Sequence, residues 1–169
     1  SAKAPETIDA VAAHCEDSGK RAKRLTVSHA FHSPHMESML EALKEVAAEC
    51  TFMPPRIPII SNVTGQLATF EQLSSPDYWA EHVRQAVRFV DGMKTLEARG
   101  VNLYLECGPR GVLSGLGAMC VTPEGVRFVP SLTHKQDELE SIRSAVGALF
   151  VHGLTIDWAA LAGTLLPTP

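Results

Sequence analysis

Short apolar segments alternate with longer amphipathic ones along this chain, and this alternation constrains its fold more than any other feature. The apolar segments expected to form strands are 25–28, 57–60, 101–107 and 126–132. The segments expected to form helices are 5–19, 35–50, 76–100, 111–120 and 137–153. Strands separated by helices run side by side in one direction. The pattern therefore predicts an α/β fold with a mainly parallel sheet and helices on both of its faces.

Helix ends are marked by residues that start or stop helical hydrogen bonding. Pro5 suits the first turn of the first helix, and Gly19 suits its end. The helix expected over 35–50 has a methionine-rich apolar stripe opposite its glutamates, typical of a core-facing helix. The long region over 76–100 is expected to break near Gln85.

Composition and charge exclude several functional classes. The 169 residues suffice for one ordinary domain, and a 45% hydrophobic and 20% charged composition indicates a folded chain. A net charge of -4 argues against a dedicated nucleic-acid binder. No apolar run approaches the roughly 18 residues of a membrane span, and no signal peptide opens the chain. Four separated cysteines without a C-x-x-C pair predict reduced thiols, so we expect a cytoplasmic protein.

Three histidines, His29, His32 and His35, lie in the stretch SHAFHSPH. A zinc site needs three or four converging ligands. At a strand end, His29 and His32 point to opposite faces, and no Cys, Asp or Glu nearby in the sequence completes a site. We therefore predict no metal site here.

His32 is also a candidate catalytic base. It follows a predicted strand and precedes a predicted helix, where side chains project into the ligand crevice of a parallel sheet. Imidazole suits proton transfer near neutral pH. A base needs a nucleophile, yet no G-x-S-x-G elbow occurs in these residues. Cys107, at the end of a predicted strand before a glycine turn, is the best candidate nucleophile within these residues. A catalytic Cys107–His32 pair is therefore an alternative. The favoured interpretation of Cys107 is a small buried apolar side chain.

Four stretches, RLTVSHAFHSPHM, IPIISNVTG, YWAEHVRQAVRF and LYLECGPRGVLSG, occur in this order. In that order the chain resembles the C-terminal part of the acyltransferase domain of modular type I polyketide synthases. The resemblance implies a partial α/β-hydrolase-like large subdomain and the last helix and strand of a ferredoxin-like small subdomain. It implies that residues 1–28 belong to the small subdomain and 29–130 to the large one. Residues 131–169 would then form the following helix and linker.

The resemblance implies a two-step transfer. A serine in a G-H-S-x-G elbow takes a malonyl group from its coenzyme A thioester and passes it to the phosphopantetheine thiol of an acyl carrier protein. His32 is the implied general base and acid, and no cofactor is expected to be bound. The serine is expected upstream of Ser1, so the chain alone is expected to be inactive without the N-terminal half of the domain.

The resemblance also assigns neighbours to His32. The main-chain carbonyl of His82 is expected to orient the imidazole. Phe31 and His29 are expected at the substrate, and the HAFH wording favours malonyl over methylmalonyl, since Phe31 can fill the volume of an α-methyl branch. The expected partners are the carrier protein, the rest of the domain, and the adjacent ketosynthase with its linker. The alternatives are a docking or scaffolding fragment using the basic stretch 20–24, or an enzyme built on Cys107.

Overall fold

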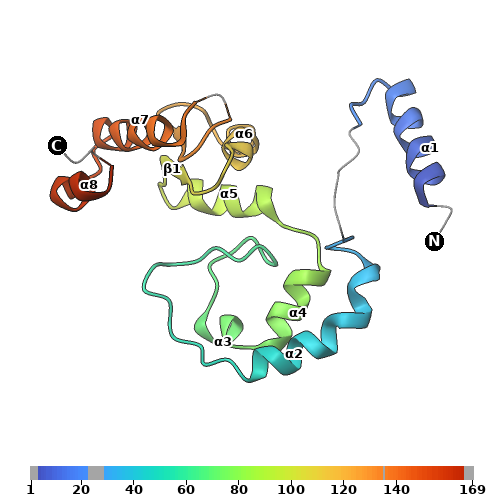
Figure 1. Ribbon diagram of the computed structural model, residues 1–169. Coiled ribbons are helices and arrows are strands. Elements are labelled where there is room, and N and C mark those ends of the chain that lie inside the picture. The colour runs from blue at the N-terminus through green and yellow to red at the C-terminus, as the bar shows by residue number, and fades with distance from the viewer. Residues whose placement is uncertain (1–3, 23–28, 135, 166–169) are drawn as a thin grey trace.

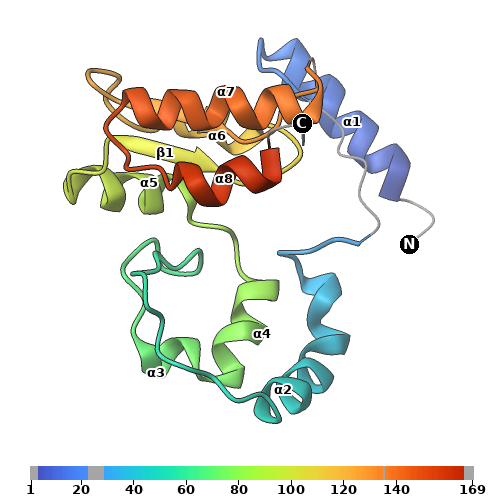
Figure 2. The same ribbon diagram turned by 60° about the vertical axis from the view of Figure 1, so that its left-hand side comes forward.

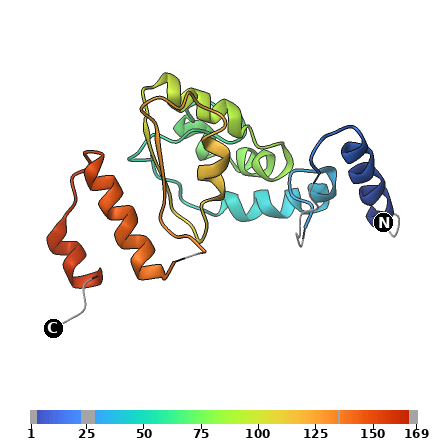
Figure 3. The same cartoon turned by 90° about the horizontal axis from the view of Figure 1, so that it is seen from above.

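The computed structural model describes residues 4–22, 29–134 and 136–165, arranged in two halves with a separate helix (Figure 1). The separate helix is α1 (Ala4–Asp17), which stands at the opposite end of the molecule from α7 (Glu138–Val151) and α8 (Trp158–Leu165) (Figures 1 and 3). Gly19, with a φ of 70°, follows α1 as predicted. The strand predicted over 25–28 lies outside the described residues.

The first half begins with a tight turn of helix. Pro34 restricts the preceding Ser33 to an extended backbone, with φ -143° and ψ 167°. The Ser33 hydroxyl then accepts a hydrogen bond from the His35 amide. The predicted single helix over 35–50 is therefore a 3-10 helix, η1 (Pro34–Met39), that continues as α2 (Leu40–Ala48). Such 3-10 turns are common at the ends of α-helices.

The predicted buried strand over 57–60 is wrong. Within the described residues this segment forms only one isolated bridge, antiparallel, between Ile60 and Leu67. Ile57 and Ile59 are 77% and 42% exposed. The prolines around this segment cannot donate to a strand ladder, which explains the lack of regular pairing.

The predicted helix break near Gln85 is confirmed. After α3 (Phe70–Leu73), α4 (Pro76–Arg84) starts on a proline, and Gln85 ends it with an extended backbone. The chain then crosses to the second half, where α5 (Phe89–Ala98) begins. Residues 85–88 form the junction segment, which joins the two halves.

The second half contains the parallel sheet. Strand β1 (Leu103–Glu106) pairs in parallel with β2 (Arg127–Pro130), and α6 (Val112–Gly117) lies in the connection between them. The strands lie between α7 on one side and α5 on the other (Figure 2). This arrangement confirms the predicted parallel pairing and the helical cover on both faces.

Opposite faces of the sheet bury different side chains, because side chains alternate along each strand. Val129 packs against Ala145 and Leu149 of α7. On the other face the rings of Tyr104 and Phe128, which are register partners, stack with centroids 4.6 Å apart. This second face packs against α6, which approaches it through a glycine.

Gly117→Ala is expected to destabilise the protein by about 1–3 kcal/mol, because its new Cβ would lie 2.6 Å from the Phe128 ring. Gly115 is the matched control in the same helix, since a Cβ there meets no atom within 4 Å. Gly115→Ala is expected to be neutral or to stabilise by up to ~1 kcal/mol. Urea unfolding of both variants measures the difference, and equal midpoints would contradict this packing.

The end of the chain adds helix where a linker was expected. Residues 158–165 form α8, and Trp158 packs edge-on against Phe150 of α7 with ring centroids 5.2 Å apart. None of the helices in the described ranges has the length and apolar character that a membrane span requires.

Candidate active site

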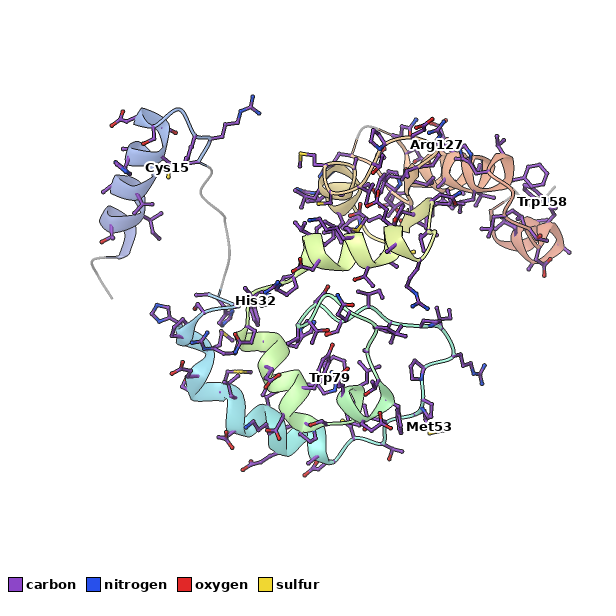
Figure 4. All side chains as sticks on the ribbon, turned by 180° about the vertical axis from the view of Figure 1, so that it is seen from behind. Cys15, His32, Met53, Trp79, Arg127 and Trp158 are labelled. Atoms are coloured by element: carbon purple, nitrogen blue, oxygen red, sulfur yellow. The ribbon has the colours of Figure 1, made fainter. Side chains whose placement is uncertain are left out.

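His32 has an unusual backbone. Its φ of 59° makes it the only residue other than glycine with a positive φ among the described residues. A side-chain-bearing residue pays a conformational cost there, so the surrounding contacts must hold it. One such contact is a hydrogen bond of 2.9 Å, which the His32 amide donates to the Val83 carbonyl. Figure 4 shows His32 where the chain entering η1 passes the end of α4.

The imidazole of His32 is oriented by a main-chain carbonyl. Its Nδ1 lies 2.7 Å from the Gln85 carbonyl oxygen. A carbonyl only accepts hydrogen bonds, so Nδ1 carries the proton in the neutral ring. The lone pair is therefore on Nε2, and the exposed ring presents that nitrogen as a proton acceptor.

The carbonyl was expected from His82, and this expectation is wrong by three residues. His82 lies within the last turn of α4, where carbonyls point along the helix axis. Gln85 caps the helix with φ -81° and ψ 159°, and this extended conformation releases its carbonyl toward His32. His82 instead places its ring edge-on to that of His32, with centroids 6.5 Å apart.

Two ionic contacts fasten η1 and α2 to α4 and so support the position of His32. Arg84 Nε lies 3.1 Å from Glu37 Oε1, and Lys44 Nζ lies 3.0 Å from Asp77 Oδ1. Hydrogen bonds from Lys44 to Asp77 and Glu41 raise the pKa of Lys44 above its ordinary value. The Asp77 side chain of this pair is 74% exposed, so the pair contributes to alignment more than to stability.

The other predicted site residues lie beside His32 in the sequence. The rings of Phe31 and His29 contact each other with centroids 6.0 Å apart, and Phe31 is 54% exposed. The structure does not bring His35 to this pair, since His35 lies in the exposed first turn of η1. The residues that the structure describes contain no group of three or more side chains able to hold a metal ion.

Cys107 lies elsewhere. It lines an apolar cavity of about 220 Å³ together with Met93, Tyr104 and Phe128, and His32 is not among the lining residues. No hydrogen bond joins Cys107 to His32 in the described part of the chain. Cys107 is exposed, so the favoured interpretation of a buried apolar side chain is wrong as well.

Glu106, next to Cys107, has a structural role that the sequence did not indicate. Desolvation alone would raise the pKa of Glu106, but amide N–H groups of Ser114, Leu113 and Val112 stabilise the carboxylate and hold its pKa below the ordinary value. Its two oxygens lie 3.0 Å and 2.6 Å from the amides of Leu113 and Ser114. The carboxylate therefore fixes the start of α6 onto the end of β1.

Comparison with known proteins decides the family. Residues 1–155 match the family model described as "Acyl transferase domain". The chain belongs to the acyl transferase domain family. Its relatives and structural neighbours include polyketide synthases and their acyltransferase domains, which confirms the resemblance inferred from the sequence and the α/β fold class.

Two curated relatives are polyketide synthases. The chain is 48% identical to Polyketide synthase GfsA of Streptomyces halstedii over 145 residues. This alignment covers 84% of the chain and 2% of GfsA. The chain is 43% identical over 152 residues to the Spectinabilin polyketide synthase system protein NorB of Streptomyces orinoci, covering 88% and 7%. The chain therefore spans only a small part of these relatives.

Solved acyltransferase domains share its fold. The acyltransferase domain from the second module of the salinomycin polyketide synthase is 38% identical with a TM-score of 0.84, over 97% of this chain and 39% of that one. The acyl transferase domain of SpnD, in complex with 2-(pent-4-yn-1-yl)malonyl, is 31% identical with a TM-score of 0.80, over 86% and 36%. This chain thus matches less than half of each solved domain.

Proposed function

We propose that this chain is the part of a polyketide synthase acyltransferase domain that supplies the general base, and that His32 is that base. The main support for this proposal is the hydrogen bond between Nδ1 of His32 and the Gln85 carbonyl, which leaves Nε2 free to accept a proton. A neutral carbonyl fixes the tautomer in the way that an aspartate does in serine hydrolases, without adding a negative charge.

The reaction has two proton-coupled halves. Nε2 of His32 takes the proton of a serine hydroxyl as the serine oxygen attacks the thioester carbonyl of malonyl-CoA. The imidazolium then returns the proton to the departing coenzyme A sulfur, which leaves malonyl-serine. In the second half His32 takes the proton of the carrier protein's phosphopantetheine thiol, the thiol sulfur attacks the ester, and the serine regains a proton.

The serine is proposed to lie in the remainder of the acyltransferase domain, in a G-H-S-x-G elbow. The proposed partners of this chain are therefore that remainder, the acyl carrier protein, and the adjacent ketosynthase with its linker. The substrate is the coenzyme A thioester, with no further cofactor. A cytoplasmic location stays a prediction.

Single-turnover loading tests the proposal. The complete domain, mixed with radiolabelled malonyl-CoA, is expected to carry label on its serine, and addition of carrier protein is expected to move the label to the carrier's thiol. The isolated 169-residue chain is expected to take up no label. Labelling of the isolated chain, at Cys107 or elsewhere, would contradict the proposal and favour the alternative enzyme.

Phe31→Ser is expected to shift the preference from malonyl toward methylmalonyl by roughly 10–200-fold, the range for one methyl group in an apolar pocket. Phe31→Tyr keeps the ring volume and serves as the control. Competition between the two coenzyme A esters for loading of the complete domain gives the ratio directly. The same ratio in all three proteins would remove Phe31 from substrate selection.

A docking or scaffolding function is the second candidate. It is supported by α1, which stands apart and is followed by exposed Lys20 and Arg21, side chains that suit an acidic carrier protein. The rest of the basic stretch extends beyond the described residues. Carrier-protein binding that survives Lys20→Glu and Arg21→Glu unchanged would rule out this surface.

A further inference from the structure

Ser61 and Tyr78 form a buried hydroxyl pair in the first half of the molecule. Ser61 is 1% exposed and Tyr78, on α4, is 8% exposed. Their hydroxyl oxygens are 2.9 Å apart and hydrogen bonded. Both residues are buried, so removal of the Ser61 hydroxyl leaves the Tyr78 hydroxyl without this acceptor and with little water to replace it.

Ser61 organises a tight turn over residues 61–66. Its hydroxyl oxygen accepts hydrogen bonds from the amides of Val63 and Thr64 at 3.1 Å and 3.3 Å. Its own amide donates to the Gln66 carbonyl at 2.8 Å, and its carbonyl accepts from the Gly65 amide at 2.7 Å. Tyr78 therefore attaches the whole turn to α4.

The turn over residues 61–66 also holds the far end of the junction segment. The Asn62 carbonyl, next to Ser61, accepts a hydrogen bond from the Arg88 amide at 2.8 Å. At the near end, the Gln85 amide donates to the Glu81 carbonyl at 2.7 Å. The segment that carries the Gln85 carbonyl is thus fixed at both ends, once by α4 and once by the turn.

We propose that Tyr78 and Ser61 are positioning residues for His32, acting through the turn, Arg88 and the Gln85 carbonyl. The inference rests on the proposed function in taking His32 as the base. Neither hydroxyl touches the imidazole, so their effect is on its orientation. Tyr78 also packs against the rings of Trp79 and His82, with centroids 5.3 Å and 6.2 Å away. Tyr78→Phe keeps these contacts and removes the hydroxyl alone.

The test uses the complete domain and measures orientation and rate separately. In Tyr78→Phe we expect the Nδ1 proton resonance of His32 to shift and the Arg88 amide to exchange faster with solvent. We expect the loading rate constant to fall about 2- to 10-fold, the effect of one hydrogen bond, with an unchanged KM for malonyl-CoA. Ser61→Ala also removes the two hydrogen bonds from the Val63 and Thr64 amides, so its effects are expected to be at least as large. The double variant is expected to be no slower than Ser61→Ala alone.

Tyr104→Phe is the matched control, because it removes a phenol hydroxyl that is hydrogen bonded to the Val101 carbonyl at 3.0 Å in the second half. It is expected to leave the His32 resonance and the loading rate unchanged. If Tyr78→Phe and Ser61→Ala move neither the His32 resonance nor the Arg88 exchange, the positioning role is overturned, whatever the activity. If both signals move while loading keeps its rate, the positioning stands and the base role of His32 fails instead.

Discussion

Replacing His32 by alanine in the complete domain is expected to slow formation of the malonyl-serine by about 100-fold or more, the usual contribution of a positioned general base. The reason is that the His32 ring, whose Nδ1 is hydrogen bonded to the Gln85 carbonyl, presents its Nε2 as the proton acceptor. Rapid-quench measurement of serine labelling during a single turnover gives the rate constant.

The neighbouring histidines are the controls for this experiment. His29→Ala and His35→Ala are each expected to keep most of the loading rate, because neither ring is the one bonded to the Gln85 carbonyl. A His32→Ala protein that loads at nearly the normal rate would contradict the assignment. A large loss in His35→Ala would point to a shared role for the cluster.

Gly65→Ala is expected to destabilise the protein by about 2–5 kcal/mol. Gly65 has a φ of 70°, and its added Cβ would overlap the Cβ of Asp91 on α5. The left-handed backbone costs a residue with a side chain roughly 1–2 kcal/mol, and the overlap adds about 1–3 kcal/mol. Because the turn contacts both α4 and α5, the two halves are expected to separate more easily.

Gly100→Ala isolates the backbone contribution. Its φ of 79° is equally left-handed, but a Cβ there meets no atom within 4 Å. A cost of only ~1–2 kcal/mol is expected. Chemical unfolding of the two variants side by side checks this, and an equal loss at both positions would show that Gly65 is not closely packed against α5.

Local signals in the sequence were sufficient for most elements of the fold. The periodicity and the breakers placed most of the helices, including the end of α4 at Gln85, because these features depend on neighbouring residues. They did not place the short helix α3 or the C-terminal helix α8. The two paired strands were also found. The segment 57–60 looked equally like a strand, but a strand requires hydrogen-bonding neighbours, and the local sequence does not specify them.

The site was only partly readable from the sequence. Motif resemblance selected His32 from three histidines, but the orienting group is a main-chain carbonyl, which every residue carries. Only the capping geometry of α4 distinguishes the Gln85 carbonyl from that of His82. The positive φ of His32 and the buried contact of Tyr78 with Ser61 depend on packing between distant segments, so no local pattern signals them.

The central claim is that His32 offers a bare Nε2 to the serine because the Gln85 carbonyl holds the proton on Nδ1. A long-range proton–nitrogen NMR spectrum of the complete domain tests this directly, with His32 assigned by comparison with His32→Gln. The account predicts, for the neutral ring, a slowly exchanging proton on Nδ1 and an unprotonated Nε2. A neutral ring with its proton on Nε2 would have its lone pair on Nδ1, not on the nitrogen proposed to face the serine, and would contradict the account.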